Sequence, residues 1–512
     1  MTGQGAPGAI ENVVIVGGGT AGWMTAAALA RGLRHLKVAI TVVESEDIGT
    51  VGVGEATIPI IHVFNNMLGL DQADFMRACN ATFKLGIEFV DWAALGETYI
   101  HPFTRYGRDL NNLQFHQMWL RHSALQAARG QADPIDDYNL CCVAARHRRF
   151  SHPVSGQDLD LGALHYAFHF DAALYAQYLR RYAETRGVVR REGRIVSVAQ
   201  DGDNGHVRSV TLASGETVAG DLFVDCSGFR GLLIEGTLKT GYHDWTRYLP
   251  ANRAIAVPCR NREDPVPYTR STADGAGWRW RIPLQHRVGN GYVYSSEFIS
   301  DDDAEARLLS QLDGEPMAAP RRLQFVTGMR KKVWNKNVVA IGLAAGFMEP
   351  LESTSIHLVH TAIVKLLAFF PDKAFAPADI AEFNRHTQAE YVRIRDFLIL
   401  HYKATRRDDT AFWRHCRDME VPETLGHIME VFQARGRLMI TADHLFTAQS
   451  WMAVMLGQGL RPQTYDPLAD GLTQAELEAH MASVRDQVAK LTHAMPGHGD
   501  YIRRFCRAEA AA

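Results

Sequence analysis

The sequence lacks the cysteine patterns of a disulfide framework or a zinc site. Its 512 residues include seven cysteines, an odd number, and only Cys141 and Cys142 are adjacent. Neighbouring residues are too close for an ordinary disulfide bridge, and no paired ligand spacing for a metal is present. Scattered free thiols are typical of a reducing compartment, so we expect a cytoplasmic protein without a bound metal.

Long apolar runs and an excess of one charge are also missing. The most apolar stretch, Leu358–Phe370, is interrupted by His360 and Lys365 and is too short to span a membrane. Met1–Ile10 does not resemble a signal peptide. The net charge of −3 offers no electrostatic case for binding nucleic acid or an anionic membrane. The length predicts two intimate subdomains or one large, elaborated fold.

The N-terminal segment predicts a dinucleotide-binding unit. A β-branched run, Val13–Val16, leads into Gly17, Gly19 and Gly22 and then into an alanine-rich helix. These glycines fit the pattern G-x-G-x-x-G between a strand and a helix. They let the backbone approach a pyrophosphate, which the helix N-terminus favours through its free N–H groups and its positive dipole end.

Neighbouring residues are expected to complete this nucleotide site. Thr20 and Ala21 lie at the predicted helix start. A second predicted strand ends at Glu44, which lies 22 residues after Gly22. An acidic side chain at about this distance reaches a ribose hydroxyl in dinucleotide-binding folds. The motif alone leaves NAD and FAD open.

Two later segments favour FAD. Residues 193–229 are predicted to form strands, with turns near Gly202–Gly205 and at Ser214-Gly215. Residues 337–350 are predicted to begin with another apolar strand. This order resembles FAD-containing monooxygenase-like folds, an α/β class with a Rossmann-type core. We therefore interpret residues 1–377 as an FAD-binding core with helical insertions at about 60–185. Residues 378–512 are interpreted as a mostly helical C-terminal subdomain that packs on the core, so that the helical parts bind the substrate.

Local signals place some of the helices. Thr473 and Glu476 form a capping-box pattern, and Pro496-Gly497 is expected to stop the helix that follows. His165 and His169 are four residues apart on a predicted helix, which raises the possibility of a metal-binding face. We reject that reading because the sequence offers no third ligand.

The stretch Gly277–Pro283, "GWRWRIP", has apolar residues at period 2 and predicts a strand with Trp278 and Trp280 on one face. It also resembles the W-x-W-x-I-P signature of flavin-dependent halogenases. Further segments match that family in the expected order: "VGVGEATIPII" (51–61), "FKLGIEFVDW" (83–92), "YAFHFDA" (166–172), "DCSGFRG" (225–231) and "EPLESTSI" (349–356). The chain most resembles the two-component, tryptophan-halogenase-like group.

This resemblance implies two separate sites, one where the oxidant forms and one where the substrate is halogenated. Reduced FAD, supplied by a separate flavin reductase, reacts with oxygen and with chloride or bromide to give hypohalous acid. The acid then passes through a tunnel to a pocket that holds a small, electron-rich aromatic. Trp278 and Trp280 line the region between the sites and keep the substrate from the flavin. The sequence shows no second nucleotide-binding motif for NAD(P)H, and a homodimer is a family-level expectation.

The resemblance also assigns roles to four polar residues. Lys84 corresponds to the essential lysine that positions or carries the oxidant, although most lysines are solvated residues on helices. Glu352 corresponds to a glutamate that stabilises the cationic intermediate or takes its proton, although it could simply complement a helix dipole. The amides of Thr354 and Ser355 correspond to the halide site. Relatives usually carry glycine where Ser355 stands, which leaves the halide preference open.

Pocket residues follow from the same comparison. His101 and Phe103 match a pair that lines the aromatic pocket, where a ring can sandwich an indole. The flavin is expected to contact four residues: Val53, Ala56, Leu343 and Ile356. Near the C-terminus, residues 446–470 offer Trp451 for stacking but lack the tyrosine pair with which tryptophan-specific enzymes hold the amino acid. Indole, or a larger indolic or phenolic compound, is therefore the expected substrate.

Two other functions compete with the halogenase reading. An aromatic hydroxylase would transfer oxygen from the flavin directly to the substrate, independently of halide, and would leave Lys84 and the two tryptophans without a role. A flavin-binding protein without turnover would act as a redox sensor or an assembly partner. No feature of the sequence favours it.

Overall fold

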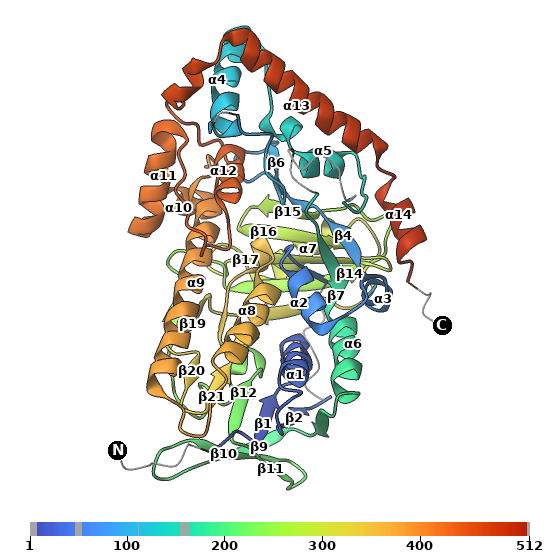
Figure 1. Ribbon diagram of the computed structural model, residues 1–512, viewed down its shortest axis with the longest axis vertical. Helices are drawn as coiled ribbons and strands as arrows, with labels where there is room; N and C mark the ends of the chain where they lie inside the picture. Colours follow the sequence, from blue (N-terminus) through green and yellow to red (C-terminus); the bar gives the residue numbers. More distant parts are fainter. Residues whose placement is uncertain (1–7, 47–53, 111, 154–160, 162–163, 509–512) are drawn as a thin grey trace.

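The computed structural model describes residues 8–46, 54–110, 112–153, 161 and 164–508. Figure 1 shows its layers along the long axis: a parallel sheet at one end, a larger sheet in the middle, and helices at the other end. This is the α/β class expected from the sequence, with a Rossmann-type core. Each of the seven cysteines, all in the described part, is buried and free.

The nucleotide-binding sheet forms where the sequence predicted it. Within the described residues it has six strands in the order β20-β21-β12-β1-β2-β8. Pairings between β21, β12, β1, β2 and β8 are parallel. Val13–Val16 of β1 are buried because the sheet is covered on both faces. The strands are β1 (Asn12–Val16), β2 (Ala39–Glu44), β8 (Val189–Glu192), β12 (Leu222–Asp225), β20 (Trp334–Asn335) and β21 (Val338–Ala340).

Three helices pack beside this sheet, with α1 in contact with both α6 and α8. A three-stranded antiparallel sheet follows β8, and its two turns lie at the predicted positions. The helices are α1 (Thr20–Gly32), α6 (Ala172–Glu184) and α8 (Ser355–Ala368), and the strands are β9 (Ile195–Gln200), β10 (Val207–Leu212) and β11 (Thr217–Ala219).

The middle layer is a seven-stranded sheet in the order β18-β14-β17-β16-β15-β5-β6, as far as the described residues show. Strand β16 spans Gly277–Pro283, so the predicted tryptophan strand is confirmed. Its neighbours are β5 (Gly86–Val90), β6 (Thr98–Pro102), β14 (Arg253–Cys259), β15 (Thr269–Asp274), β17 (Val288–Tyr294) and β18 (Arg321–Gln324). The parallel pairing of β15 with β5 joins the insertion at residues 60–185 to this sheet.

The insertion is less helical than the sequence indicated. His169 lies in a strand, β7 (Ala167–Asp171), and not in a helix with His165. Pairing of β7 with β3 (Gly54–Ala56) and β4 (Thr82–Lys84) overrides the local helical pattern. The insertion's helices are α2 (Ile61–Leu68), α3 (Gln72–Ala78), α4 (Phe115–Ala127) and α5 (Leu140–Arg146). The described residues include no cluster of three or more potential metal ligands.

The C-terminal part is helical, as predicted. Thr473 and Glu476 form the predicted capping box of α13, which ends at Ala494, just before Pro496. Among the described residues no helix is both long enough and apolar enough to cross a membrane. The helices are α9 (Pro377–Lys403), α10 (Ala411–Asp418), α11 (Glu423–Arg435), α12 (Ala448–Gly457), α13 (Gln474–Ala494) and α14 (His498–Phe505).

Shorter elements complete the described chain. They include α7 (Asp301–Ser310), β13 (Tyr242–Asp244), β19 (Gly328–Arg330), β22 (Gly346–Phe347) and a 3₁₀ turn, η5 (Pro350–Glu352).

Candidate functional site

A cavity of about 990 Å³ runs from the glycine-rich turn after β1 to the tryptophan strand β16. It brings together most of the residues predicted to bind the cofactor. Those that line it are Gly17, Gly19, Thr20, Ala21, Glu44, Ala56, Leu343 and Ile356. Trp278, Trp280 and Ser355 line it as well. Val53 lies outside the described residues.

The glycines fit the role of a pyrophosphate cradle. A Cβ on Gly18 would lie 1.4 Å from a carboxylate oxygen of Glu44, and one on Gly17, whose φ is +110°, would lie 2.3 Å from the Cys226 carbonyl oxygen. No side chain caps the N-terminus of α1, so its first amides are free to bind an anion. Gly22 does not line the cavity; a Cβ there would collide with the Gly17 carbonyl oxygen at 1.8 Å. It packs the helix against the turn.

Glu44 ends β2 beside this cradle, as the spacing predicted. Its Oε1 pairs with Arg190 and lies 3.7 Å from Arg180. Its Oε2 accepts a 3.4 Å hydrogen bond from the indole of Trp23. The carboxylate is therefore fixed at the cavity wall, where a ribose is expected.

Lys84 lies at the end of β4 and is fully buried, so it is not the solvated helix residue of the alternative reading. Its Nζ donates to the carbonyl oxygen of Thr57 at 2.9 Å and to Oγ of Ser353 at 2.8 Å. Burial lowers the pKa of the amine to about 7, and the nearby charge of Glu352 opposes that effect. A neutral amine here satisfies both acceptors and keeps its lone pair free.

Glu352, at the end of η5, is buried between two histidines. Nδ1 of His101 is 2.8 Å from its Oε2, and Nε2 of His401 is 2.7 Å from its Oε1. Burial alone would raise the pKa of this carboxyl, but the charges and hydrogen bonds of the two rings outweigh it and hold the pKa at about 2. Nδ1 of His401 also lies 2.9 Å from the Phe397 carbonyl oxygen. Both nitrogens of the His401 ring therefore lie within 3 Å of an oxygen.

The residues predicted to bind the halide, Thr354 and Ser355, come shortly after Glu352 in the chain. Ser353 has a left-handed conformation, with φ +58°, and this bend separates η5 from α8. Thr354 precedes the first residue of α8, Ser355, and no side chain caps that helix. The first amides of a helix have no partner within it, so this end can accept an anion. Ser355 lines the cofactor cavity, whereas Thr354 is not among its lining residues.

Aromatic side chains surround the other face of this polar group. The Phe103 ring is half-buried, with its centroid 5.2 Å from Lys84 Nζ. His101 lies 5.7 Å from Phe397, and Phe397 contacts Trp451 at 5.0 Å, measured between ring centroids. Phe446 stacks on Phe397 at 3.9 Å. His101 and Trp451 thus belong to one aromatic wall, in which Phe397 contacts both, whereas the Phe103 ring faces Lys84.

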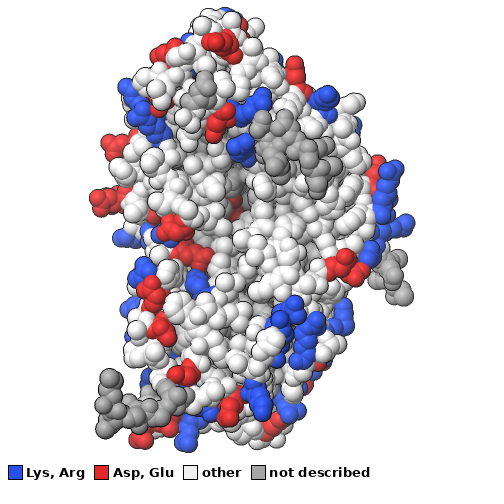
Figure 2. Space-filling view, viewed as in Figure 1, with Lys and Arg blue, Asp and Glu red and all other residues white. Residues whose placement is uncertain are grey.

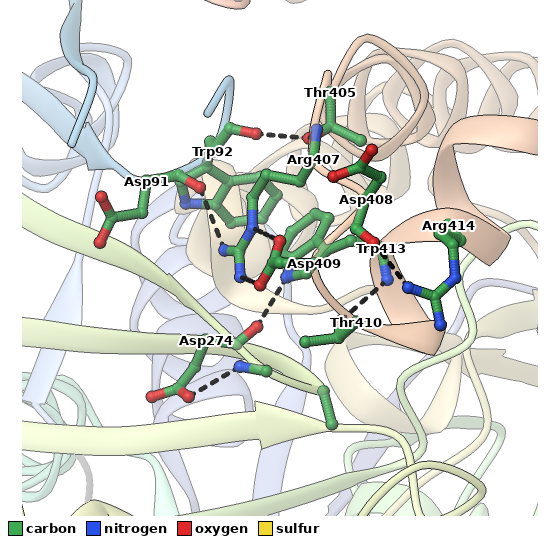
Figure 3. Close-up of polar contacts among 12 residues, drawn as sticks. Asp91, Trp92, Asp274, Thr405, Arg407, Asp408, Asp409, Thr410, Trp413 and Arg414 are labelled. Atoms are coloured by element: carbon green, nitrogen blue, oxygen red, sulfur yellow. Dashed lines mark hydrogen bonds and ion pairs between the residues drawn. The ribbon is translucent and has the colours of Figure 1, made fainter. Parts of the chain in front are cut away.

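Trp278 and Trp280 are both buried in β16, with ring centroids 6.2 Å apart. Trp92 packs behind Trp278 at 6.3 Å and also contacts Trp413 at 5.4 Å. The Trp413 indole donates to the Asp274 carbonyl oxygen at 2.7 Å, next to the β15–β16 turn, as Figure 3 shows. The tryptophan strand is therefore supported from the side away from the cofactor cavity.

An arginine completes this support (Figure 3). Arg407 donates through Nε and Nη2 to the two carboxylate oxygens of Asp409, each at 2.8 Å. Its Nη1 donates to the Asp91 carbonyl oxygen at 3.1 Å, and its guanidinium lies 4.7 Å from the centre of the Trp413 ring. These contacts fasten the segment after α9 to the segment after β5.

Sequence reasoning missed three residues of the site: Thr57, Ser353 and His401. Thr57 and Ser353 lie inside the family-like segments and could have been named from them. His401 stands alone on α9, 49 residues after Glu352. No local pattern marks it, because only the folded chain brings the two side chains together.

Comparison with known proteins places this site in a family. The family model for tryptophan halogenase matches residues 12–474. Tryptophan 6-halogenase SttH from Streptomyces toxytricini is 36% identical over 96% of this chain and 98% of that protein. The structure of a flavin-dependent halogenase from Xanthomonas campestris is similar with a TM-score of 0.94 and 48% identity, covering 98% of this chain and 100% of that chain.

BrvH, a flavin-dependent halogenase from Brevundimonas sp. BAL3, is similar with a TM-score of 0.92 and 48% identity, over 96% of this chain and 99% of that one. These likenesses extend over nearly the whole chain and support halogenation, not the hydroxylase alternative. The chain belongs to the tryptophan halogenase family and is a flavin-dependent halogenase.

Proposed function

We propose that this halogenase acts on a neutral, electron-rich aromatic such as indole, with Lys84 and Glu352 as its catalytic residues. One observation carries the proposal: the buried amine of Lys84 lies between Ser353, which lines the cofactor cavity, and the ring of Phe103, which is predicted to line the aromatic pocket. A group in that position meets an oxidant formed at the flavin before the oxidant reaches the substrate. The reaction converts reduced FAD, O₂, halide and a proton into FAD, hypohalous acid and water.

FAD fits the residues of the cavity. When bound, the reduced flavin supplies the chemistry that activates dioxygen and oxidises chloride or bromide. The glycine turn and α1 hold the pyrophosphate, and Glu44 binds a ribose hydroxyl. The start of α8 at Thr354 and Ser355 binds the halide.

Lys84 receives the hypohalous acid and holds it toward the aromatic wall. Its two N–H bonds are engaged by Thr57 and Ser353, which leaves the lone pair of the neutral amine for the oxidant. The halogen then bonds to the ring carbon, and the hydroxyl group leaves as water with the ring proton. Glu352, held ionised by His101 and His401, stabilises the cationic ring before that proton departs.

The substrate is expected to be uncharged. Residues 446–456, which include Trp451, contain no Asp, Glu, Lys or Arg, so an amino acid's ammonium and carboxylate would find no opposite charge there. Figure 2 shows a largely uncharged area in the middle of the face, with a group of basic residues below it and charged residues of both signs beside it. The chain is also more similar to the two flavin-dependent halogenases from Xanthomonas campestris and Brevundimonas, at 48% sequence identity, than to tryptophan 6-halogenase SttH, at 36%.

The test is mass spectrometry of turnover with a flavin reductase, NADH, FAD and oxygen. Indole and tryptophan are offered in parallel, with chloride or bromide. The proposal also includes a separate flavin reductase, a cytoplasmic location and a homodimer. A halogen isotope pattern on indole that disappears in Lys84→Ala supports it. A preference for free tryptophan would contradict the substrate, and full activity of Lys84→Ala would contradict the role of the lysine.

A further inference from the structure

A second chain of hydrogen bonds leads to the cofactor cavity without passing through Lys84. His169 lies on β7, the middle strand of the β3-β7-β4 sheet, and is fully buried. Its Nδ1 is 3.0 Å from Oγ1 of Thr82, and its Nε2 is 2.9 Å from Oγ1 of Thr269. Thr269 is itself one of the residues that line the cofactor cavity. The three side chains therefore connect the interior of the small sheet to the wall of the cofactor cavity.

The direction of these hydrogen bonds follows from counting protons. The hydroxyl of Thr82 donates to the carbonyl oxygen of Pro283 at 2.7 Å. A hydroxyl has one proton to donate, and a carbonyl can only accept. Thr82 must therefore accept from His169, which places a ring proton on Nδ1 of the histidine.

The other ring nitrogen then has to accept. Burial is the main reason that the pKa of His169 lies well below its usual value. The ring is neutral, and with its one proton on Nδ1 it has a bare Nε2. Thr269 must donate its hydroxyl proton to that nitrogen.

Thr269 consequently has no proton left for the cavity. Its oxygen can only accept a hydrogen bond from a bound group. Thr269 begins β15, and the next residue, Arg270, pairs with Arg281 on the tryptophan strand. The threonine thus lies at the tryptophan end of the cavity, away from the glycine turn.

We propose that the chain Thr82–His169–Thr269 presents a fixed hydrogen-bond acceptor to the flavin ring and makes the protein favour reduced over oxidised FAD. The inference rests on the proposed function, because it takes the ring to lie at the tryptophan end. Two-electron reduction turns acceptor nitrogens of the ring into N–H donors. An oxygen that can only accept gains a hydrogen bond with the reduced ring and meets a lone pair on the oxidised one.

This preference suits an enzyme that receives its flavin already reduced. It captures the reduced form and releases the oxidised product. Thr269 makes the contact, and His169 is a positioning residue that sets the direction of the threonine hydroxyl. Neither residue is needed to hold the halide or the substrate.

The binding test compares Thr269→Val with Thr269→Ser. Valine keeps the shape of threonine and removes the oxygen, whereas serine keeps the oxygen. Anaerobic titration with reduced FAD and aerobic titration with oxidised FAD give the two dissociation constants. We expect Thr269→Val to bind reduced FAD about tenfold more weakly and oxidised FAD within about threefold of the parent, with Thr269→Ser close to the parent. If Thr269→Val lost affinity equally for reduced and oxidised FAD, or lost no affinity for reduced FAD, the inference would be overturned.

A second test needs no flavin, halide or substrate. In protein with ¹⁵N-labelled histidine rings, NMR distinguishes a proton on Nδ1 from one on Nε2. The His169 signals are assigned by their loss in His169→Gln or by their shift in Thr82→Val. We expect the neutral Nδ1–H tautomer in the unsubstituted protein, and its replacement in Thr82→Val. A proton on Nε2 overturns the inference whatever the protein halogenates, while a parent enzyme that yields no halogenated product counts against the proposed function alone.

Discussion

Nζ of Lys84 and the hydroxyl of Ser353 are joined by a 2.8 Å hydrogen bond, although 269 positions separate them in the chain. The bond links strand β4 to the segment that carries Glu352 and the start of α8. Because Ser353 also lines the cofactor cavity, this contact ties the position of the lysine to the wall of that cavity. A shift of that segment would move the amine relative to the cofactor and to the aromatic wall.

The rate of the halogenation step should increase as the pH rises through about 7. Burial lowers the pKa of Lys84 to about 7, so the fraction of free amine rises as the pH passes that value. The free amine has a lone pair for the oxidant, whereas the ammonium has none. Rapid quenching of single turnovers at several pH values measures this dependence. A rate that falls through pH 7 would show that the ammonium is the active form.

The same shift has a consequence for stability. The folded protein releases the Lys84 proton near pH 7, whereas the unfolded chain keeps it to about pH 10. The unfolded state binds the extra proton between these values, so the lysine makes the protein more stable as the pH rises through this window. Urea unfolding of the parent and of Lys84→Met should show this rise in the parent and a smaller one in the variant.

Replacing Glu352 with glutamine should slow halogenation and lower the pKa of Lys84. Loss of the carboxylate removes the group proposed to stabilise the cationic ring, a role worth roughly 10²–10⁴ in rate. The charge of Glu352 raises the pKa of Lys84, so the residual activity of Glu352→Gln should rise at a lower pH than that of the parent. The exposed Glu97→Gln serves as a control with unchanged rate and pH profile. An unshifted profile in Glu352→Gln would contradict the coupling.

Gly291 on β17 leaves space for the Trp280 ring. A Cβ there would lie 2.1 Å from two ring carbons and 2.6 Å from the Ile255 carbonyl oxygen. Gly291→Ala should lower the free energy of unfolding by about 1–3 kcal/mol and weaken FAD binding, because Trp280 lines the cavity. Gly202→Ala, with no atom within 4 Å, is the matched control and should have little effect. Normal FAD affinity in Gly291→Ala would show that the ring adapts.

Arg407 should be important for stability, unlike a surface arginine. Its side chain is 3% exposed, and Asp409 and the Asp91 carbonyl would lose their donor in Arg407→Met. We expect the free energy of unfolding to fall by roughly 2–3 kcal/mol, since Asp409 is partly solvated. Arg385→Met breaks an exposed pair with Glu382 and should cause no measurable loss. Chemical denaturation of both variants compares them directly.

Elements with strong local signals could be predicted from the sequence. Strand β16 was found because its tryptophans alternate with arginines, and α13 because its capping box involves residues three apart. The strand that contains His169 was wrongly predicted as helix. The spacing of its apolar residues fits the period of a helix as well as that of a strand. The pairing with β3 and β4 that makes it a strand joins segments far apart in the chain.

In the candidate site, too, some residues could be predicted from the sequence and others could not. Lys84 and Glu352 could be named from motifs that surround them, and the structure brings both to one buried group. The contacts that set their ionisation could not be named. His101 and His401 reach Glu352 from β6 and from α9, and nothing near His401 in the chain marks it as its partner.

Helix α9 has 27 residues, a length of about 40 Å at the usual rise per residue. Tyr391 on this helix lines the cofactor cavity, Phe397 belongs to the aromatic wall, and His401 holds Glu352. One rigid element therefore serves both ends of the reaction path. Chimeras that exchange residues 378–512 between relatives to obtain a new substrate range would also transplant a residue of the cofactor cavity and the partner of the proposed catalytic carboxylate. Engineers who want to change only the acceptor should graft α12 and the segment before it, and leave α9 in place.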